Sequence, residues 1–107
     1  MTEIARRVMP KKSDLNKHFV YLMTNASNTV VFTGRTNNLE RRLQEHRKKR
    51  SGDFAQRDKI NKLVYFESFS SAPEAQLREH QIKTGPRRKK DALISLANPD
   101  WLNLQIG

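Results

Sequence analysis

Two short strand-like runs, separated by four turn-forming residues, constrain the fold of this chain more than any other feature. Residues 18–24 (HFVYLMT) and 29–33 (TVVFT) are rich in β-branched, aromatic and other apolar side chains. Residues 25–28 (NASN) are turn formers. We therefore predict an antiparallel β-hairpin, with Gly34 ending its second strand.

The remainder of the chain carries helix signals around one further strand signal. Thr36, Asn37 or Asn38 can cap a helix that reaches about residue 49, and residues 63–69 (LVYFESF) have the composition of a third strand. A second helix is predicted from residues 71–73 to the break at 84–86, and a third over 91–96. The predicted order is β-β-α-β-α-α, which is an α+β domain.

The charge balance favours a polyanionic partner. The 107 residues suffice for one domain and include 21 Lys and Arg against 11 Asp and Glu, a formal net charge of +10. Nucleic acid is the first candidate, because each neutralised phosphate releases condensed counterions. The alternative is that the charge only keeps a small domain soluble. Basic residues cluster in segments 1–12, 41–50 and 87–90, which favours nucleic acid.

Composition also excludes several classes of protein. The chain has no cysteine, which excludes a disulfide framework and a thiolate metal site. It contains no apolar stretch of about 18 residues and no secretory signal, so we expect a cytoplasmic protein without a membrane segment. Residues 1–17 are expected to form a flexible basic extension in front of a domain over residues 18–104.

The first predicted helix carries two side chains suited to phosphodiester chemistry on one face. Arg42 and His46 are four residues apart, so both can meet one phosphate. Arg42 would stabilise negative charge in phosphodiester attack, and His46 would hold or relay a proton near neutral pH. The alternative is that Leu39 and Leu43 face inward while Arg42 and His46 lie on a solvated face.

A carboxylate and a phenol complete the candidate set. Glu79 lies among basic residues and can anchor Mg²⁺ with water and phosphate as further ligands, or it can form an ordinary ion pair with Lys83. Tyr21 lies on the first predicted strand. It is either a packing aromatic with a hydrogen-bonded hydroxyl or a general base whose pKa falls beside Arg42.

The motifs of this chain resemble those of the small stand-alone GIY-YIG domain proteins of bacteria. The resemblance covers residues 18 to 104 and is carried by segments 19–24, 31–46, 62–67, 74–83, 88–94 and 98–101. It implies a three-stranded antiparallel sheet flanked by helices. It also implies hydrolysis of a DNA phosphodiester with one divalent cation, Mg²⁺ or Mn²⁺.

The resemblance assigns roles by position. Tyr21 matches the tyrosine of the first motif, Arg42 the helix arginine, His46 the helix His or Tyr, and Glu79 the metal-binding glutamate. Gly34 matches the glycine that closes the second strand, where a side chain would crowd the site.

Two positions depart from the family pattern. Phe32 replaces the tyrosine of the second motif, so one catalytic hydroxyl is missing, and Phe19 replaces the first motif's glycine. If the missing hydroxyl is the base, activity is lost. If it only orients water or phosphate, its loss costs roughly 1.5 to 3 kcal/mol, or about one to two decades in rate.

The sequence predicts a metal-dependent endonuclease acting on DNA, with Arg35, Arg42, Lys89 and Lys90 as nucleic-acid contacts. The alternative is a nucleic-acid-binding module that has lost turnover through Phe32. A weaker option is a structural domain that recruits a protein partner. RNA as a substrate and the oligomeric state stay open, with a monomer as the default expectation.

Overall fold

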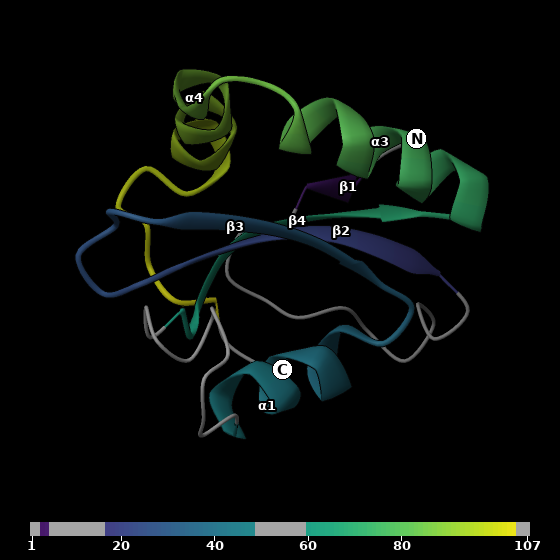
Figure 1. The fold of residues 1–107 in the computed structure, drawn as a ribbon, viewed down its shortest axis with the longest axis horizontal. Coiled ribbons are helices and arrows are strands. Elements are labelled where there is room, and N and C mark those ends of the chain that lie inside the picture. Colours follow the sequence, from purple (N-terminus) through teal and green to yellow (C-terminus); the bar gives the residue numbers. More distant parts are fainter. Residues whose placement is uncertain (1–2, 5–16, 49–59, 105–107) are drawn as a thin grey trace.

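The fold consists of an antiparallel sheet with α1 on one face and α3 and α4 on the other (Figure 1). The computed structural model describes residues 3–4, 17–48 and 60–104. In chain order the elements are β1 (Glu3–Ile4), β2 (His18–Thr24), β3 (Val31–Thr36), α1 (Leu39–Lys48), β4 (Lys62–Phe69), α3 (Ala72–Lys83) and α4 (Arg87–Ala97). The predicted order β-β-α-β-α-α and the antiparallel core of β2, β3 and β4 are confirmed.

A short N-terminal strand adds to the three predicted ones. Glu3 pairs with Ser68 and Ile4 with Glu67, so the strand order is β1-β4-β2-β3. Within the extension predicted over residues 1–17, Glu3–Ile4 forms this strand, because the open backbone edge of β4 accepts a further strand. Residues 1–2 and 5–16 of that extension lie outside the described residues.

The predicted hairpin is formed by β2 and β3. The side chain of Asn25 accepts hydrogen bonds from the backbone N–H groups of Thr29 (2.9 Å) and Val30 (3.2 Å), and Asn28 takes a left-handed φ of 59°. One boundary differs from the prediction. Gly34 does not end the second strand, because β3 continues to Thr36 and Gly34 pairs with Tyr21 inside the ladder.

The helices begin at the expected caps with one exception. Asn38 accepts a hydrogen bond from the N–H of Arg41 at 3.1 Å, and the N-cap Ser71 begins α3. The third helix was predicted from residue 91, but α4 begins at Arg87 directly after Pro86. Lys89 and Lys90 therefore lie on a helix.

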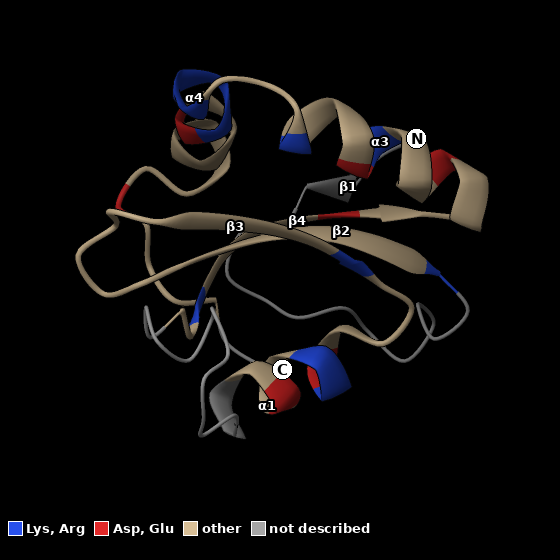
Figure 2. Cartoon of the chain, viewed as in Figure 1, with Lys and Arg blue, Asp and Glu red and all other residues tan. Residues whose placement is uncertain are grey.

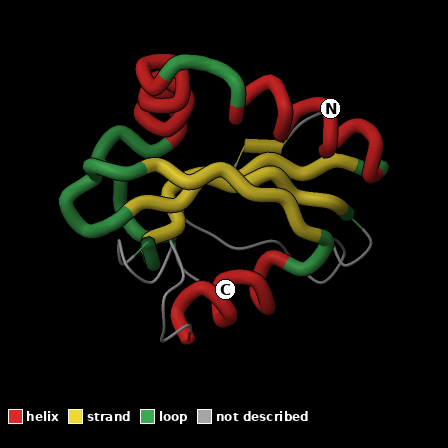
Figure 3. The backbone as a smooth tube through the Cα atoms, in the orientation of Figure 1, coloured by secondary structure: helices red, strands yellow, loops and turns green. Residues whose placement is uncertain are grey.

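Figure 3 shows the helices on either side of the strands. Two clusters of apolar side chains hold these layers together. The cluster beneath α1 joins Leu39 and Leu43 to the side chains of Tyr21 and Met23. The cluster on the opposite face contains the following residues of the sheet and of α3 and α4: Val20, Leu22, Val64, Tyr65, Ala75, Ile82 and Ile94. The sheet is thus buried on both faces.

An irregularity in the β2–β4 ladder decides which β4 side chains join which cluster. Leu22 pairs with Tyr65 but Met23 pairs with Leu63, so Val64 is an extra residue at a β-bulge. Val64 and Tyr65 consequently both join the cluster under α3 and α4, although they are consecutive. The strict alternation of a regular strand would have separated them.

The segment after α4 returns to β4. Leu104 is buried and donates its N–H to the carbonyl of Leu63 at 2.8 Å, and Trp101 packs against the second cluster. Leu102, between them in the sequence, is 42% exposed. Within the described residues, no helix is long and apolar enough to cross a membrane.

Candidate active site

The candidate site is built on the pairing of Tyr21 with Gly34. These residues face each other across β2 and β3. A Cβ placed on Gly34 would overlap Cζ and the hydroxyl oxygen of Tyr21, so the ring lies directly over the glycine. Only glycine leaves this volume free for the phenol, which gives a physical reason for the expected crowding at this position.

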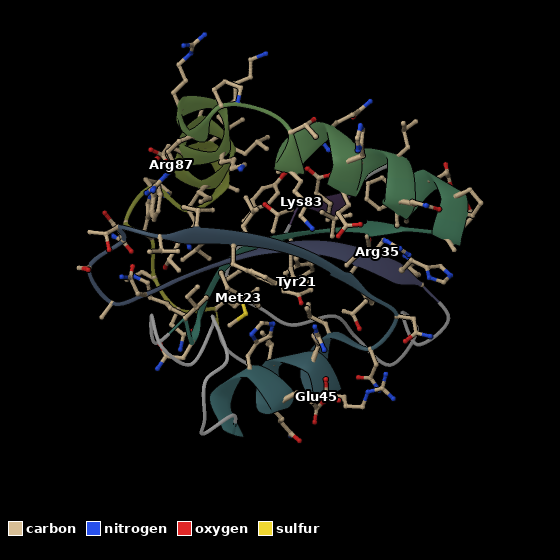
Figure 4. The ribbon with its side chains drawn as sticks, in the orientation of Figure 1. Tyr21, Met23, Arg35, Glu45, Lys83 and Arg87 are labelled. Carbon is tan, nitrogen blue, oxygen red and sulfur yellow. The ribbon has the colours of Figure 1, made fainter. Side chains whose placement is uncertain are left out.

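Helix α1 supplies two polar side chains to the same place. Leu39, Arg42, Leu43 and His46 follow the i, i+3, i+4, i+7 spacing of one helix face, and this face packs on the sheet. The Nε of Arg42 donates to the hydroxyl of Tyr21 at 3.2 Å, and Nε2 of His46 lies 3.3 Å from the same hydroxyl. The alternative that Arg42 and His46 point away on a solvated face is therefore wrong. Figure 4 shows Tyr21 between the sheet and α1.

The environment of Tyr21 keeps its phenol protonated. Burial raises the pKa of Tyr21, while the hydrogen bond and the charge of Arg42 lower it in part, and the charges of Glu79 and Glu45 raise it again. The net direction is upward. The sequence-based expectation that this pKa falls beside Arg42 is thus wrong for the free protein, because the cost of burial exceeds the effect of the arginine.

Phe32 forms the aromatic wall of the site. Its ring centroid lies 5.1 Å from that of His46 and 6.2 Å from that of Tyr21. The side chain is partly buried and packs against the cluster beneath α1. Phe32 therefore lies beside the other predicted site residues, but it offers an apolar edge where a tyrosine would carry a hydroxyl.

Glu79 lies on α3 and meets the site from the other face of the sheet. Its Oε1 accepts a hydrogen bond from Nε of Arg35 at 3.0 Å. This ion pair replaces the pair with Lys83 that we considered from the sequence. The charge of this carboxylate is one of the smaller influences that raise the pKa of Tyr21. Arg35 and Glu79 line an open pocket of about 510 Å³ beside α3.

The donor set at Glu79 fits a cation that keeps most of its waters. Within the described residues there is no group of three or more His, Cys, Asp or Glu side chains that could enclose a metal ion. Glu79 is 20% exposed, and among the described residues its Oε2 accepts no hydrogen bond. Mg²⁺ is commonly bound through one or two carboxylates together with water and substrate phosphate, which matches this arrangement.

Glu74, the other carboxylate on α3, has a local role. Its carboxylate accepts hydrogen bonds from the hydroxyls of Ser70 (3.2 Å) and Ser71 (3.0 Å). Its backbone N–H donates to Ser71, which makes it part of the helix cap. Glu79 is therefore the better placed of the two carboxylates.

The predicted nucleic-acid contacts divide into two groups. Figure 2 shows Lys and Arg on α1 and on the sheet and, separately, on α4. Arg35 lies on β3 beside Glu79, and Arg42 lies on α1 beside Tyr21. Lys89 and Lys90 lie on α4, across the sheet from α1, and line a separate pocket of about 430 Å³ that also includes Arg78. The structure does not bring these two lysines to the Tyr21 hydroxyl.

Sequence reasoning missed a buried charge pair that fixes α3. Glu67 on β4 is 2% exposed and accepts hydrogen bonds from Arg78 at 2.8 and 3.0 Å and from the hydroxyl of Tyr65. Arg78 directly precedes Glu79, so the contact between Arg78 and Glu67 fixes the position of Glu79 relative to the sheet. The available signal was a single acidic residue inside an apolar strand, which requires a buried partner.

Comparisons with known proteins identify the family of this chain. The family model described as the GIY-YIG catalytic domain matches residues 17–91. A UPF0213 protein of Natronomonas pharaonis is 37% identical over 78 residues, which cover 73% of this chain and 91% of the relative. A UPF0213 protein of Clostridium perfringens is 38% identical over 78 residues, covering 73% and 83%.

A solved structure of a similar protein has the same fold. The solution NMR structure of a UPF0213 protein from Bacillus halodurans aligns with a TM-score of 0.53 at 28% identity, and the match covers 81% of this chain and 92% of that one. GIY-YIG domains form a superfamily of nucleases, which supports a nuclease-type function with a nucleic-acid substrate. From the matched residues and the shared fold, this chain belongs to the GIY-YIG family, among small members similar to the UPF0213 proteins.

Proposed function

We propose that this protein is an endonuclease that hydrolyses DNA phosphodiester bonds with one divalent cation, Mg²⁺ or Mn²⁺. The observation that carries the proposal is the contact of Arg42 and His46 with the Tyr21 hydroxyl, and Glu79 on α3 adds a carboxylate whose charge reaches Tyr21. These groups supply a phosphate contact, a proton carrier and a cation ligand, which are the components that such hydrolysis uses. The net charge of +10 supports a polyanionic substrate.

Arg42 is the residue that we expect to meet the phosphate. Its side chain is 39% exposed, whereas Tyr21 is fully buried beneath it. When Arg42 turns toward the phosphoryl oxygens, its charge stabilises the charge that develops there and its Nε leaves the phenol. The same movement admits water to the Tyr21 hydroxyl.

Tyr21 and His46 then act together on a proton. Tyr21 accepts a proton from the attacking water and gives its own hydroxyl proton to Nε2 of His46, 3.3 Å away. The two transfers are coupled because burial disfavours a free phenolate at Tyr21. Glu79 would hold the cation, which when bound supplies positive charge at the phosphate and lowers the pKa of a coordinated water.

We expect low sequence specificity, with any preference directed to the structure of the DNA. The cationic side chains at the site, Arg35 and Arg42, are suited to phosphates. Phosphates are the same in every sequence, so such contacts position the duplex without identifying its bases.

A second function is favoured by one specific observation. Phe32 places a ring without a hydroxyl 5.1 Å from the ring of His46, at a position where the family usually has tyrosine. A site that needs this hydroxyl would bind nucleic acid through the same basic surface without cutting it. The alternative is therefore a non-catalytic nucleic-acid-binding module with a degenerate nuclease site.

Cleavage assays on labelled duplex, single-stranded and branched DNA with Mg²⁺ or Mn²⁺ distinguish these functions. The wild type is compared with Glu79→Gln and with Glu74→Gln, a matched control on the same helix whose carboxylate serves the cap. We expect cutting by the wild type and Glu74→Gln and its loss in Glu79→Gln. Binding of DNA without cutting by the wild type would support the binding module. Equal cutting by Glu79→Gln would contradict the cation ligand.

A further inference from the structure

We propose that Arg35 makes cation binding at Glu79 depend on DNA, because it neutralises this carboxylate in the free protein and moves to a phosphate in the complex. The inference rests on the proposed function, since it concerns the same carboxylate. It adds a coupling residue that takes part in both binding events.

The first observation is the contact itself. Arg35 reaches from β3 to α3, and its Nε lies 3.0 Å from Oε1 of Glu79. A guanidinium at this distance repels a dication approaching the same carboxylate and occupies one of its two oxygens. A cation can therefore bind at full strength only after Arg35 has left.

The second observation is that the side chain of Arg35 can move away from Glu79 to another acceptor. It lies on β3, the last strand in the order of the sheet, and its side chain is 36% exposed. The open pocket beside Glu79 is also lined by His80 and Lys83, so the surroundings favour an anion. A DNA phosphate offers Arg35 two non-bridging oxygens, which can accept the two parallel hydrogen bonds of a planar guanidinium group.

The two binding events are then linked. DNA frees Glu79 for the cation, and the cation in turn releases Arg35 for DNA, by the same factor. The Arg35–Glu79 pair is partly exposed, so its effect is modest. We expect removal of Arg35 to raise the affinity for a divalent cation about two- to fivefold in the absence of DNA.

Lys83 provides a matched control. It lines the same pocket and follows Glu79 by one helical turn, but within the described residues it forms no ion pair with Glu79. The Lys83→Gln variant removes one positive charge from the pocket without removing the direct contact. It separates the specific effect of Arg35 from the general field of the basic surface.

The experiment measures Mn²⁺ binding by electron paramagnetic resonance in the full-length protein, first without DNA. The variants are wild type, Arg35→Gln, Arg35→Lys, Lys83→Gln and Glu79→Gln, each checked for folding by circular dichroism. We expect tighter binding in Arg35→Gln than in wild type, a smaller gain in Lys83→Gln, and an intermediate value for Arg35→Lys, which keeps the charge but loses the Nε donor.

The measurement is repeated with a saturating phosphorothioate duplex, which resists hydrolysis. DNA should increase the Mn²⁺ affinity of the wild type more than that of Arg35→Gln, by the same two- to fivefold factor. Equal affinities of wild type and Arg35→Gln without DNA, or equal gains in Arg35→Gln and Lys83→Gln, would overturn the inference. Unchanged Mn²⁺ binding by Glu79→Gln would instead refute the cation site of the proposed function.

Discussion

The phenol of Tyr21 occupies the volume that a side chain on Gly34, its partner on the neighbouring strand, would need. The ring can therefore lie flat across β3 and bring its hydroxyl to Arg42 at 3.2 Å. Packing, rather than chemistry alone, explains why this strand has a glycine in its interior.

The contact predicts the effect of a single methyl group. Gly34→Ala should lower the free energy of unfolding by about 1 to 3 kcal/mol, because the ring of Tyr21 has to leave its position. Urea denaturation measures the change. In a Tyr21→Ala background the same substitution should cost much less. Equal costs in both backgrounds would show that the two residues do not interact in this way.

The tyrosines predict a stability change at high pH. Burial raises the pKa of both Tyr21 and Tyr65 above the ordinary value of 10.0, and the sequence contains two tyrosines in all. Above about pH 10 the unfolded chain loses these protons while the folded protein keeps them, so the unfolded state binds fewer protons. The stability that the two buried, protonated tyrosines give to the folded protein is therefore complete below about pH 10. It is lost as the pH rises toward and through the pKa values of the folded protein.

Ultraviolet absorbance of tyrosinate against pH tests this prediction in native and denatured protein. The denatured chain should titrate near pH 10 and the native protein at higher pH. The Tyr65→Phe variant isolates Tyr21. A native curve that coincides with the denatured one would contradict burial of the two phenols.

The buried charge pair beneath α3 predicts a large loss of stability. Arg78→Ala leaves the carboxylate of Glu67, 3% exposed, without its cation. We expect a loss of roughly 2 to 4 kcal/mol, below the range for a fully buried pair because the Arg78 side chain is 32% exposed. Arg41→Ala is the control, since its pair with Glu45 is 64% and 46% exposed and should contribute about 1 kcal/mol or less. Similar losses in denaturant titrations would refute the special role of Glu67.

The apolar side chain of Phe32 leads us to predict that a tyrosine at this position increases the rate of DNA cleavage. Phe32→Tyr should raise the DNA cleavage rate by about one to two decades, because the restored hydroxyl can orient water or phosphate beside His46. Phe32→Leu keeps the position apolar and should not raise the rate. Single-turnover cleavage measures both variants. Equal rates for wild type and Phe32→Tyr would show that the missing hydroxyl does not limit the reaction.

Local signals in the sequence were sufficient for the hairpin and for the first helix face. The turn formers around Asn25 and the four-residue spacing of Arg42 and His46 act within one element or between adjacent ones. The same logic was insufficient for α4, where the first turn is entirely basic and Pro86 gives no side-chain cap. Apolar periodicity begins only after these residues, so the predicted helix began too late.

Contacts between distant elements could not be predicted from the sequence. The nearest basic residue by helix spacing suggested Lys83 as the partner of Glu79, whereas the fold supplies Arg35, which is 44 positions away. The partnership of Glu67 with Arg78 likewise depends on how α3 lies across the sheet. The rise in the pKa of Tyr21 depends on burial, which sequence spacing does not report.

Strand β3 closes one side of the sheet, and its outer row of backbone groups faces away from β2. Such a row is a template for pairing with a second copy of the strand, which is how many small β proteins aggregate. Arg35 stands on this strand with an exposed, charged side chain. A charged side chain on an edge strand disfavours such pairing, so the residue beside the candidate site also counts against association of two copies through β3.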